Sequence, residues 1–368
     1  MGLWRKDKIS DSCVYVGQVR NGSLYVAKGK TAEQEGKCHI EGEAVIPMSD
    51  PGEISANLNS RLGWESGQPL LVSHSFPLML GSAVSISVPR HEEGHALVRD
   101  SREAAHLAQW RAADRVREET ANFFSCSLED IKSLGASMER WKETSENISG
   151  TIFQACVPSW SYEKMNQNTE LIPQSESFML PMLLSKRVGR GDTPEAILHV
   201  DDFVSALIVR KNNSLTYVRS IENGIASIKD HMVQALSCSE KEAEILLKLL
   251  TKNKLNETNK KSISRIIRDL FPLWTGMFNS LVADIPLSER PLLLEVRGLF
   301  PDLIAKYFCK PQILMSWSHT PVKIRIPRNE NPEDFGIRID VKAGLNQIFS
   351  KGPSLTSVVN QLGFHVSA

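Results

Sequence analysis

The stretch from His91 to His95 has the residue types and spacing of a zinc-binding motif, HExxH. On a helix, His91 and His95 would lie one turn apart on the same face, where both imidazoles could bind one zinc ion. Glu92 would then be placed to activate a water molecule bound to that zinc. This chemistry is that of a zinc metallopeptidase, and we keep it as an alternative function of the chain.

The residues around this motif argue against a zinc site. Pro89 stands two residues before His91, so a helix would begin at the first ligand, and Gly94 would weaken that helix. A third ligand is also needed, and His106 would lie roughly 16 Å further along a straight helix. We therefore expect no bound metal at this motif. No Ser-His-Asp or Cys-His arrangement is visible either, so we expect no catalytic residues.

The composition sets the class of protein. The 368 residues are 41% hydrophobic and 23% charged, which indicates a globular chain long enough for two or three domains. Lys+Arg and Asp+Glu are equal at 43 each, so no overall field attracts nucleic acid, and we expect no such partner. The six cysteines lack CxxC spacing, which favours reduced thiols. No apolar run reaches the roughly 18 residues of a transmembrane helix, so we expect a cytoplasmic protein.

The segment from residue 194 to 228 is the most informative part of the chain. Two apolar runs rich in branched residues, Ala196–Val200 and Ala206–Arg210, have the composition of buried strands. Asn212-Asn213 then predicts a tight turn into a further strand, which leads to a helix. The carboxylate of Asp201 follows the first run directly. We therefore expect antiparallel strands with an acidic residue at the end of the first one.

The flanking segments alternate between strand and helix patterns. Before this segment, a hairpin turns at Asn21-Gly22, and a long helical pattern runs from about residue 96 to 122. After it, Ser239-Glu240-Lys241-Glu242 is a capping box that predicts the start of a helix. Pro272 should kink a further helix over residues 262–285. This order of strands and helices predicts an α/β protein.

Two segments resemble actin-like proteins of the PilM and FtsA type. The first is the hairpin that contains Val14-Tyr15-Val16-Gly17, and the second is the strand and turn at Asp201 with the later helix start CSEKEAEILLK. The resemblance implies a two-lobed, actin-like (ribonuclease H-like) α/β fold with a small α+β insert subdomain. It divides the chain into part of a first actin-like subdomain (1–80), the insert with its long helix (81–190), a second actin-like subdomain (191–342) and a C-terminal amphipathic tail (343–368).

The resemblance also implies the position of a nucleotide site. In this family, glycine-bearing turns and aspartates surround the phosphates of ATP and its Mg²⁺, because backbone N–H groups must approach phosphate closely. The corresponding residues here are Gly17, Asp201, Ser205, Gly224 and Gly298. Bulky Phe203, Val204 and Phe300 stand in the same loops and would occupy space that the ligand needs. We expect nucleotide binding to be weak or lost and no cofactor to be bound, with ATP and Mg²⁺ at these residues as the alternative.

The implied function is a scaffold or adaptor in a membrane-associated machine, above all type IV pilus assembly. Such a protein would be held at the inner membrane through its partners. These would be the cytoplasmic tail of an inner-membrane assembly protein, an assembly ATPase and further copies of the chain itself. We expect no turnover chemistry, as in a pseudo-ATPase. An ATP-binding, polymerising division protein of the FtsA type is the second alternative, beside the zinc metallopeptidase.

Overall fold

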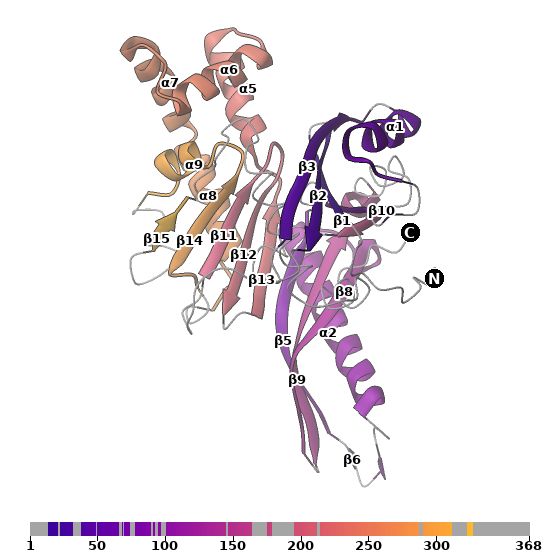
Figure 1. Cartoon of the computed structure of the whole chain (residues 1–368). Helices are drawn as coiled ribbons and strands as arrows, with labels where there is room; N and C mark the ends of the chain where they lie inside the picture. Colours follow the sequence, from indigo (N-terminus) through magenta and orange to yellow (C-terminus); the bar gives the residue numbers. More distant parts are fainter. Residues whose placement is uncertain are drawn as a thin grey trace. The chain divides into compact units, whose positions relative to one another are not determined.

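The computed structural model divides the chain into two compact units, Met1–Leu184 with Ile337–Ala368, and Ser185–Gly336 (Figure 1). The residues that it describes are 14–20, 23–31, 38–48, 50–65, 68, 70–73, 78–89, 91–92, 95–96, 101–144, 146–163, 175–178, 195–211, 214–286, 290–310 and 322–326. The amphipathic tail predicted at 343–368 lies outside the described residues.

The first unit contains a five-stranded sheet in the order β10-β4-β1-β2-β3. Its strands are β1 (Val14–Arg20), β2 (Ser23–Thr31), β3 (Cys38–Pro47), β4 (Leu70–Ser73) and β10 (Ser175–Phe178). The predicted N-terminal hairpin is confirmed, because β1 and β2 pair antiparallel. Helix α1 (Pro51–Leu62) buries Ile54 and Leu58 in the core of this sheet. Asp50 caps the helix by accepting a hydrogen bond from the N–H of Gly52 at 2.7 Å.

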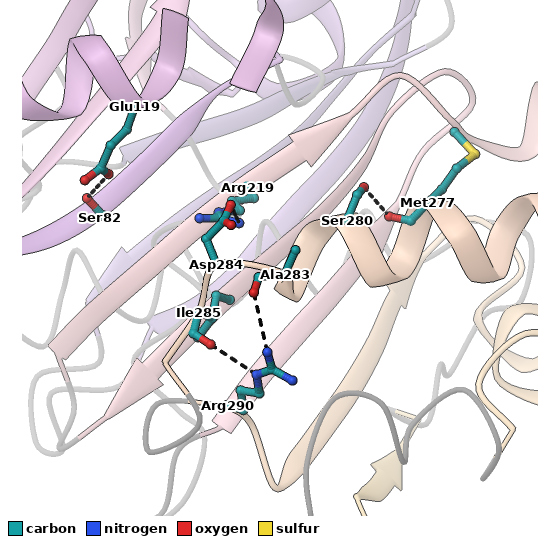
Figure 2. A network of polar contacts seen from close by, with 9 residues as sticks. All are labelled: Ser82, Glu119, Arg219, Met277, Ser280, Ala283, Asp284, Ile285 and Arg290. Carbon is teal, nitrogen blue, oxygen red and sulfur yellow. Dashed lines mark hydrogen bonds and ion pairs between the residues drawn. The ribbon is translucent and has the colours of Figure 1, made fainter. Parts of the chain in front are cut away.

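A long helix packs on three antiparallel strands in the same unit. The strands lie in the order β5 (Leu80–Pro89), β9 (Asn147–Pro158) and β8 (Ile131–Glu143), and a short 3₁₀ helix (Leu128–Asp130) precedes β8. Helix α2 (Ser101–Phe124) confirms the helix expected near 96–122. Ala104, Ala108 and Ala112 recur every four residues and are fully buried against the strands. The Ser82 hydroxyl on β5 also donates to Glu119 at 3.2 Å (Figure 2).

Helix α2 is the longest helix in the described part of the chain, but its outer face is charged. No helix among the described residues is both long enough and apolar enough to cross a bilayer.

The second unit places strands and helices in separate layers. Its strands lie in the order β15 (Lys323–Arg325), β14 (Leu293–Gly298), β11 (Glu195–Val200), β12 (Ser205–Lys211) and β13 (Ser214–Ile221). The helices are α5 (Ile225–Leu236), α6 (Glu240–Thr251), α7 (Glu257–Asp269), α8 (Phe271–Val282) and α9 (Pro301–Tyr307). Leu198, Leu207 and Val296 of the sheet share one core with Trp274. The ring of Trp274 stacks on that of Phe308, with 4.4 Å between the ring centroids.

The kink expected at Pro272 is a break between two helices. Helices α7 and α8 meet at Leu270, and Pro272 lies in the first turn of α8, where its missing N–H leaves no bond unmade. Side-chain contacts hold the segment that follows the C-terminal end of α8 (Figure 2). Arg290 donates to the carbonyl oxygen of Ile285 at 3.1 Å, and Arg219 of β13 pairs with Asp284 at 3.0 Å.

Candidate nucleotide-type site

Three loops of the second unit meet at one edge of its sheet. Strands β11 and β14 run parallel with Val200 opposite Gly298, so the turn after β11 and the loop after β14 leave the sheet together. The N–H of Leu299 joins these two loops by donating to the Val200 carbonyl oxygen at 2.7 Å. The third loop contains Gly224 and leads into α5. Open α/β sheets bind ligands at the carboxyl ends of their parallel strands, so this edge is the candidate site.

Close backbone contacts at this edge require two of the predicted glycines. A Cβ atom at Gly224 would lie 2.3 Å from the carbonyl oxygens of both Asp201 and Asp202. A Cβ atom at Gly298 would lie 2.1 Å from the carbonyl oxygen of Val200, and its φ of +92° is one that only glycine adopts readily. Both glycines therefore bring the loops into direct backbone contact with the end of β11.

The N-terminus of α5 is turned toward the same strand end. Ile225 donates its N–H to the Asp201 carbonyl oxygen at 2.9 Å, and Ala226 donates to that of Asp202 at 2.8 Å. Helix N-termini bind phosphate when their first N–H groups point at the anion. Here these two donors are already satisfied by the backbone of the neighbouring turn.

The side chains of the turn fall into a buried and an exposed set. Asp201 is buried, and the buried hydroxyl of Ser205 donates to the carbonyl oxygen of Asn223 at 2.6 Å. Phe300 is buried in the helix-side core, with a left-handed backbone at φ 49°. Phe203 is 64% exposed, so its ring points away from the core. That Phe203 occupies space a ligand would need stays a prediction, now for a ring on the solvent side of the turn.

A buried lysine forms ion pairs with the turn and with α6. Lys229 of α5 places its ammonium 3.1 Å from Asp202 and 3.0 Å from Glu240, the first residue of α6. The side chains of Lys229 and Asp202 are 8% and 10% exposed, whereas Glu240 is 67% exposed. Burial lowers the pKa of Lys229, but the bonds and charges of Glu240 and Asp202 outweigh burial and raise the pKa above its ordinary value. Lys229 thus stays charged and joins α5, α6 and the turn.

Gly17, which the resemblance places in a glycine-bearing turn, lies in a strand. Gly17 lies inside β1 and pairs with Val26 of β2, so this segment is strand. A Cβ atom at Gly17 would meet Leu24 and the carbonyl oxygen of Tyr25 at 3.0 and 3.1 Å. The glycine therefore serves close packing within the hairpin. Asn21-Gly22, where the turn is predicted, lies outside the described part of the chain.

The HExxH motif is not helical. Residues His91–Glu92 form β6 and His95–Ala96 form β7, and the two pair antiparallel with His91 opposite Ala96. The i, i+4 helical geometry that the zinc reading requires is therefore absent. The backbone is already extended through Pro89 at the end of β5, which favours a hairpin over a helix start. No group of three or more metal-ligating side chains occurs among the described residues.

Comparison with known proteins gives the fold. No protein-family model matches the chain, and no curated protein does. A solved structure described as the PilM-PilN type IV pilus biogenesis complex matches with a TM-score of 0.59 at 11% identity, covering 92% of this chain and 99% of that chain. A Bacteroides thetaiotaomicron protein described as having an actin-like ATPase fold matches at 0.37 and 9% identity, covering 94% and 99%. The chain has the actin-like fold.

MreB 5 of Spiroplasma citri, solved with AMPPNP, also matches, with a TM-score of 0.45 at 8% identity that covers 92% of this chain and 97% of that chain. At these identities the likeness concerns the fold alone. Within the actin-like fold of this chain, Asp201, Ser205, Gly224 and Gly298 come together at the edge described above. Gly17 belongs to the other unit.

Three backbone N–H groups at this edge of the second unit are engaged within the protein. A bound phosphate needs backbone N–H groups that are free to donate to it. The N–H groups of Ile225, Ala226 and Leu299 instead donate to the carbonyl oxygens of residues 200–202. The Asp202 carboxylate is likewise engaged with Lys229. We therefore assign no step of ATP chemistry to these residues.

Sequence reasoning missed the ionic cluster of Asp202, Lys229 and Glu240. A signal for it existed, since Ile225, Ile228 and Met232 form the apolar stripe of α5 and Lys229 continues that stripe. A lysine inside an apolar stripe needs a buried partner, and the acidic turn before the helix supplies it.

Proposed function

We propose that this chain is an actin-like scaffold of the PilM type that binds the cytoplasmic tail of an inner-membrane assembly protein and does not turn over ATP. The likeness to the chain of the PilM-PilN complex, over 92% of this chain, supports the scaffold role. In this role the chain associates with the membrane through its partner. Type IV pilus assembly is the machine that this likeness favours.

One observation supports the proposal that the chain does not turn over ATP. At the sheet edge of the second unit, the N–H groups of Ile225, Ala226 and Leu299 all donate to the end of β11 and its turn. Binding a triphosphate there would require breaking these hydrogen bonds and opening the ion pair between Lys229 and Asp202. Each buried group left without a partner costs about 1–3 kcal/mol. We infer that this edge holds the lobe together in place of a nucleotide.

Nucleotide binding is tested by thermal unfolding of the purified full chain with and without Mg-ATP. A protein that holds ATP at 100 times its Kd gains about 2.7 kcal/mol, which would raise the Tm of a 368-residue chain by roughly 3–4 °C. We expect no shift at millimolar Mg-ATP and no release of phosphate. A shift of that size, or hydrolysis above the buffer rate, would contradict the proposal.

Partner binding is tested with a fluorescein-labelled peptide. The peptide copies the cytoplasmic tail of the inner-membrane assembly protein encoded beside this chain, and a scrambled peptide of the same composition is the control. We expect a saturable increase in fluorescence anisotropy with the native tail and no increase with the scrambled peptide. Equal binding of the two peptides, or of neither, would refute the scaffold role.

A further inference from the structure

A basic surface covers the α6–α7 part of the second unit. From Glu240 to Asp269, which spans both helices, the sequence has eight lysines and arginines and five acids, a local net charge of +3 in a chain whose total is zero. Figure 1 shows α6 and α7 beyond the end of the sheet of this unit. The positive charge is therefore concentrated on α7 and the loop before it, whereas α6 carries three acids and two lysines.

The cations lie on the side of α7 that does not pack. Helix α7 buries Ile263, Ile266 and Ile267, and the opposite side carries Lys261, Arg265 and Arg268. These three residues and Lys254 of the α6–α7 loop are all exposed. Lys261, Arg265 and Arg268 are spaced by four and three residues, so they form a row along the helix. We call Lys254, Lys261, Arg265 and Arg268 the basic surface.

An apolar side chain stands on the outer side of α6. Ile245 is 53% exposed, whereas Ala243, Leu247 and Leu250 of the same helix are buried. Lys241, Glu242 and Lys248 are near neighbours of Ile245 along the helix, and Lys248 pairs with Glu244 at 2.7 Å. On a helix that lies on a lipid surface, an exposed apolar side chain of this kind can enter the headgroup region.

We propose that the α6–α7 basic surface binds anionic lipid headgroups, so that the scaffold contacts the membrane directly as well as through its partner. This inference extends the proposed function and rests on its membrane location. Clustered lysines and arginines are attracted to the negative potential of an acidic leaflet. Residues 240–268 contain no aromatic residue and no histidine. Proteins that bind single-stranded nucleic acid stack bases on aromatic rings, so this composition favours lipid over nucleic acid.

The test is cosedimentation of the purified full chain with vesicles. One set contains phosphatidylcholine alone, and the other contains about 30 mol% phosphatidylglycerol, an anionic lipid. We expect binding to the anionic vesicles only, and loss of that binding when NaCl rises from about 0.1 M to about 0.5 M, since salt screens surface charges. Equal binding to both vesicle sets, or to neither, would overturn the proposal.

Matched variants locate the binding surface. The triple change Lys254→Gln, Lys261→Gln, Arg265→Gln removes three exposed cations and should weaken vesicle partitioning roughly 100-fold. The control triple change Arg111→Gln, Lys142→Gln, Lys323→Gln removes three exposed cations elsewhere and should change partitioning by no more than about twofold. Ile245→Ser should weaken it roughly fivefold by removing the inserted side chain. Equal losses in both triple variants would refute a localised site.

Two further measurements distinguish lipid binding by this surface from nucleic-acid binding and from binding of the partner's tail. Tighter binding of the unmodified chain to duplex DNA than to anionic vesicles at one salt concentration, lost in the first triple variant, would assign the surface to nucleic acid and overturn the proposal. The tail peptide should still bind that variant with unchanged affinity. Vesicle binding without tail binding would refute the partner role alone, and tail binding without vesicle binding would refute the lipid surface alone.

Discussion

Replacement of Lys229 by methionine tests whether the ionic cluster holds the candidate site together. The ammonium lies 3.1 Å from the Asp202 carboxylate, and Coulomb's law with an effective dielectric constant of 20 gives an attraction of about 5 kcal/mol. Desolvation of both groups offsets much of this attraction. Lys229→Met leaves Asp202 buried without its cation, so we expect a loss of about 3 kcal/mol of unfolding free energy.

The measurement is urea unfolding followed by tryptophan fluorescence, to which the fully buried Trp274 of the same unit contributes. A loss of about 3 kcal/mol should lower the unfolding midpoint by roughly 1 M urea. Glu240→Gln removes a partner that is 67% exposed, and it should cost less than about 1 kcal/mol. Adding Asp202→Asn to Lys229→Met should recover about 2 kcal/mol, because the stranded charge is removed.

The contribution of Lys229 to stability should fall at high pH. The folded-state pKa of Lys229 is raised above the ordinary 10.5, so its contribution to stability is complete below pH 10.5 and is lost as the pH rises through the folded pKa. Wild type should therefore lose more stability than Lys229→Met above pH 10.5. If Lys229→Met keeps the wild-type midpoint, or Asp202→Asn rescues nothing, the ionic cluster does not stabilise this edge.

Two further predictions concern the glycines and the thiols. Gly224→Ala places a Cβ atom 2.3 Å from two carbonyl oxygens and should cost about 3 kcal/mol or more, whereas Gly276→Ala on α8 meets open space and should stabilise the helix by up to about 1 kcal/mol. Urea midpoints for the two variants that move in the same direction would contradict this reasoning. Burial raises the pKa of both Cys156 and Cys309 to about 12, so neither should react with iodoacetamide at neutral pH until the chain unfolds. Peptide mass spectrometry of the alkylated native protein checks this, and rapid labelling of either thiol would show that its surroundings open readily.

Local patterns predicted the elements that depend on local chemistry. Branched apolar runs gave β11 and β12, and the capping box at Ser239 is present as expected, with Glu242 accepting the Ser239 N–H at 2.8 Å. The break near Pro272 followed from the missing N–H of proline. The resemblance in two segments predicts the actin-like fold, and the structural likeness over 92% of this chain agrees with it.

The errors arose where a residue type has two structural meanings. Gly17 was read as a loop glycine, but a glycine within a strand also permits close packing, and β1 continues to Arg20. The five letters of HExxH carry no information about backbone conformation, and the chain is extended at both histidines. Lys229 was overlooked because its buried partner, Asp202, lies on a different element. The periodicity of α5 places Lys229 on the buried stripe, but which acidic residue pairs with it depends on tertiary structure.

Two glycines of the second unit are required by close backbone contacts, and this requirement decides whether they indicate a nucleotide site. Gly224 and Gly298 are required because the backbone of residues 200–202 lies 2.1 to 2.3 Å from where their Cβ atoms would be. That requirement holds whether or not a phosphate is bound. The turn at residues 201–204 contains no glycine, and its sequence is Asp-Asp-Phe-Val. Retention of Gly224 and Gly298 is therefore no argument for nucleotide, and the composition of the turn is the informative feature.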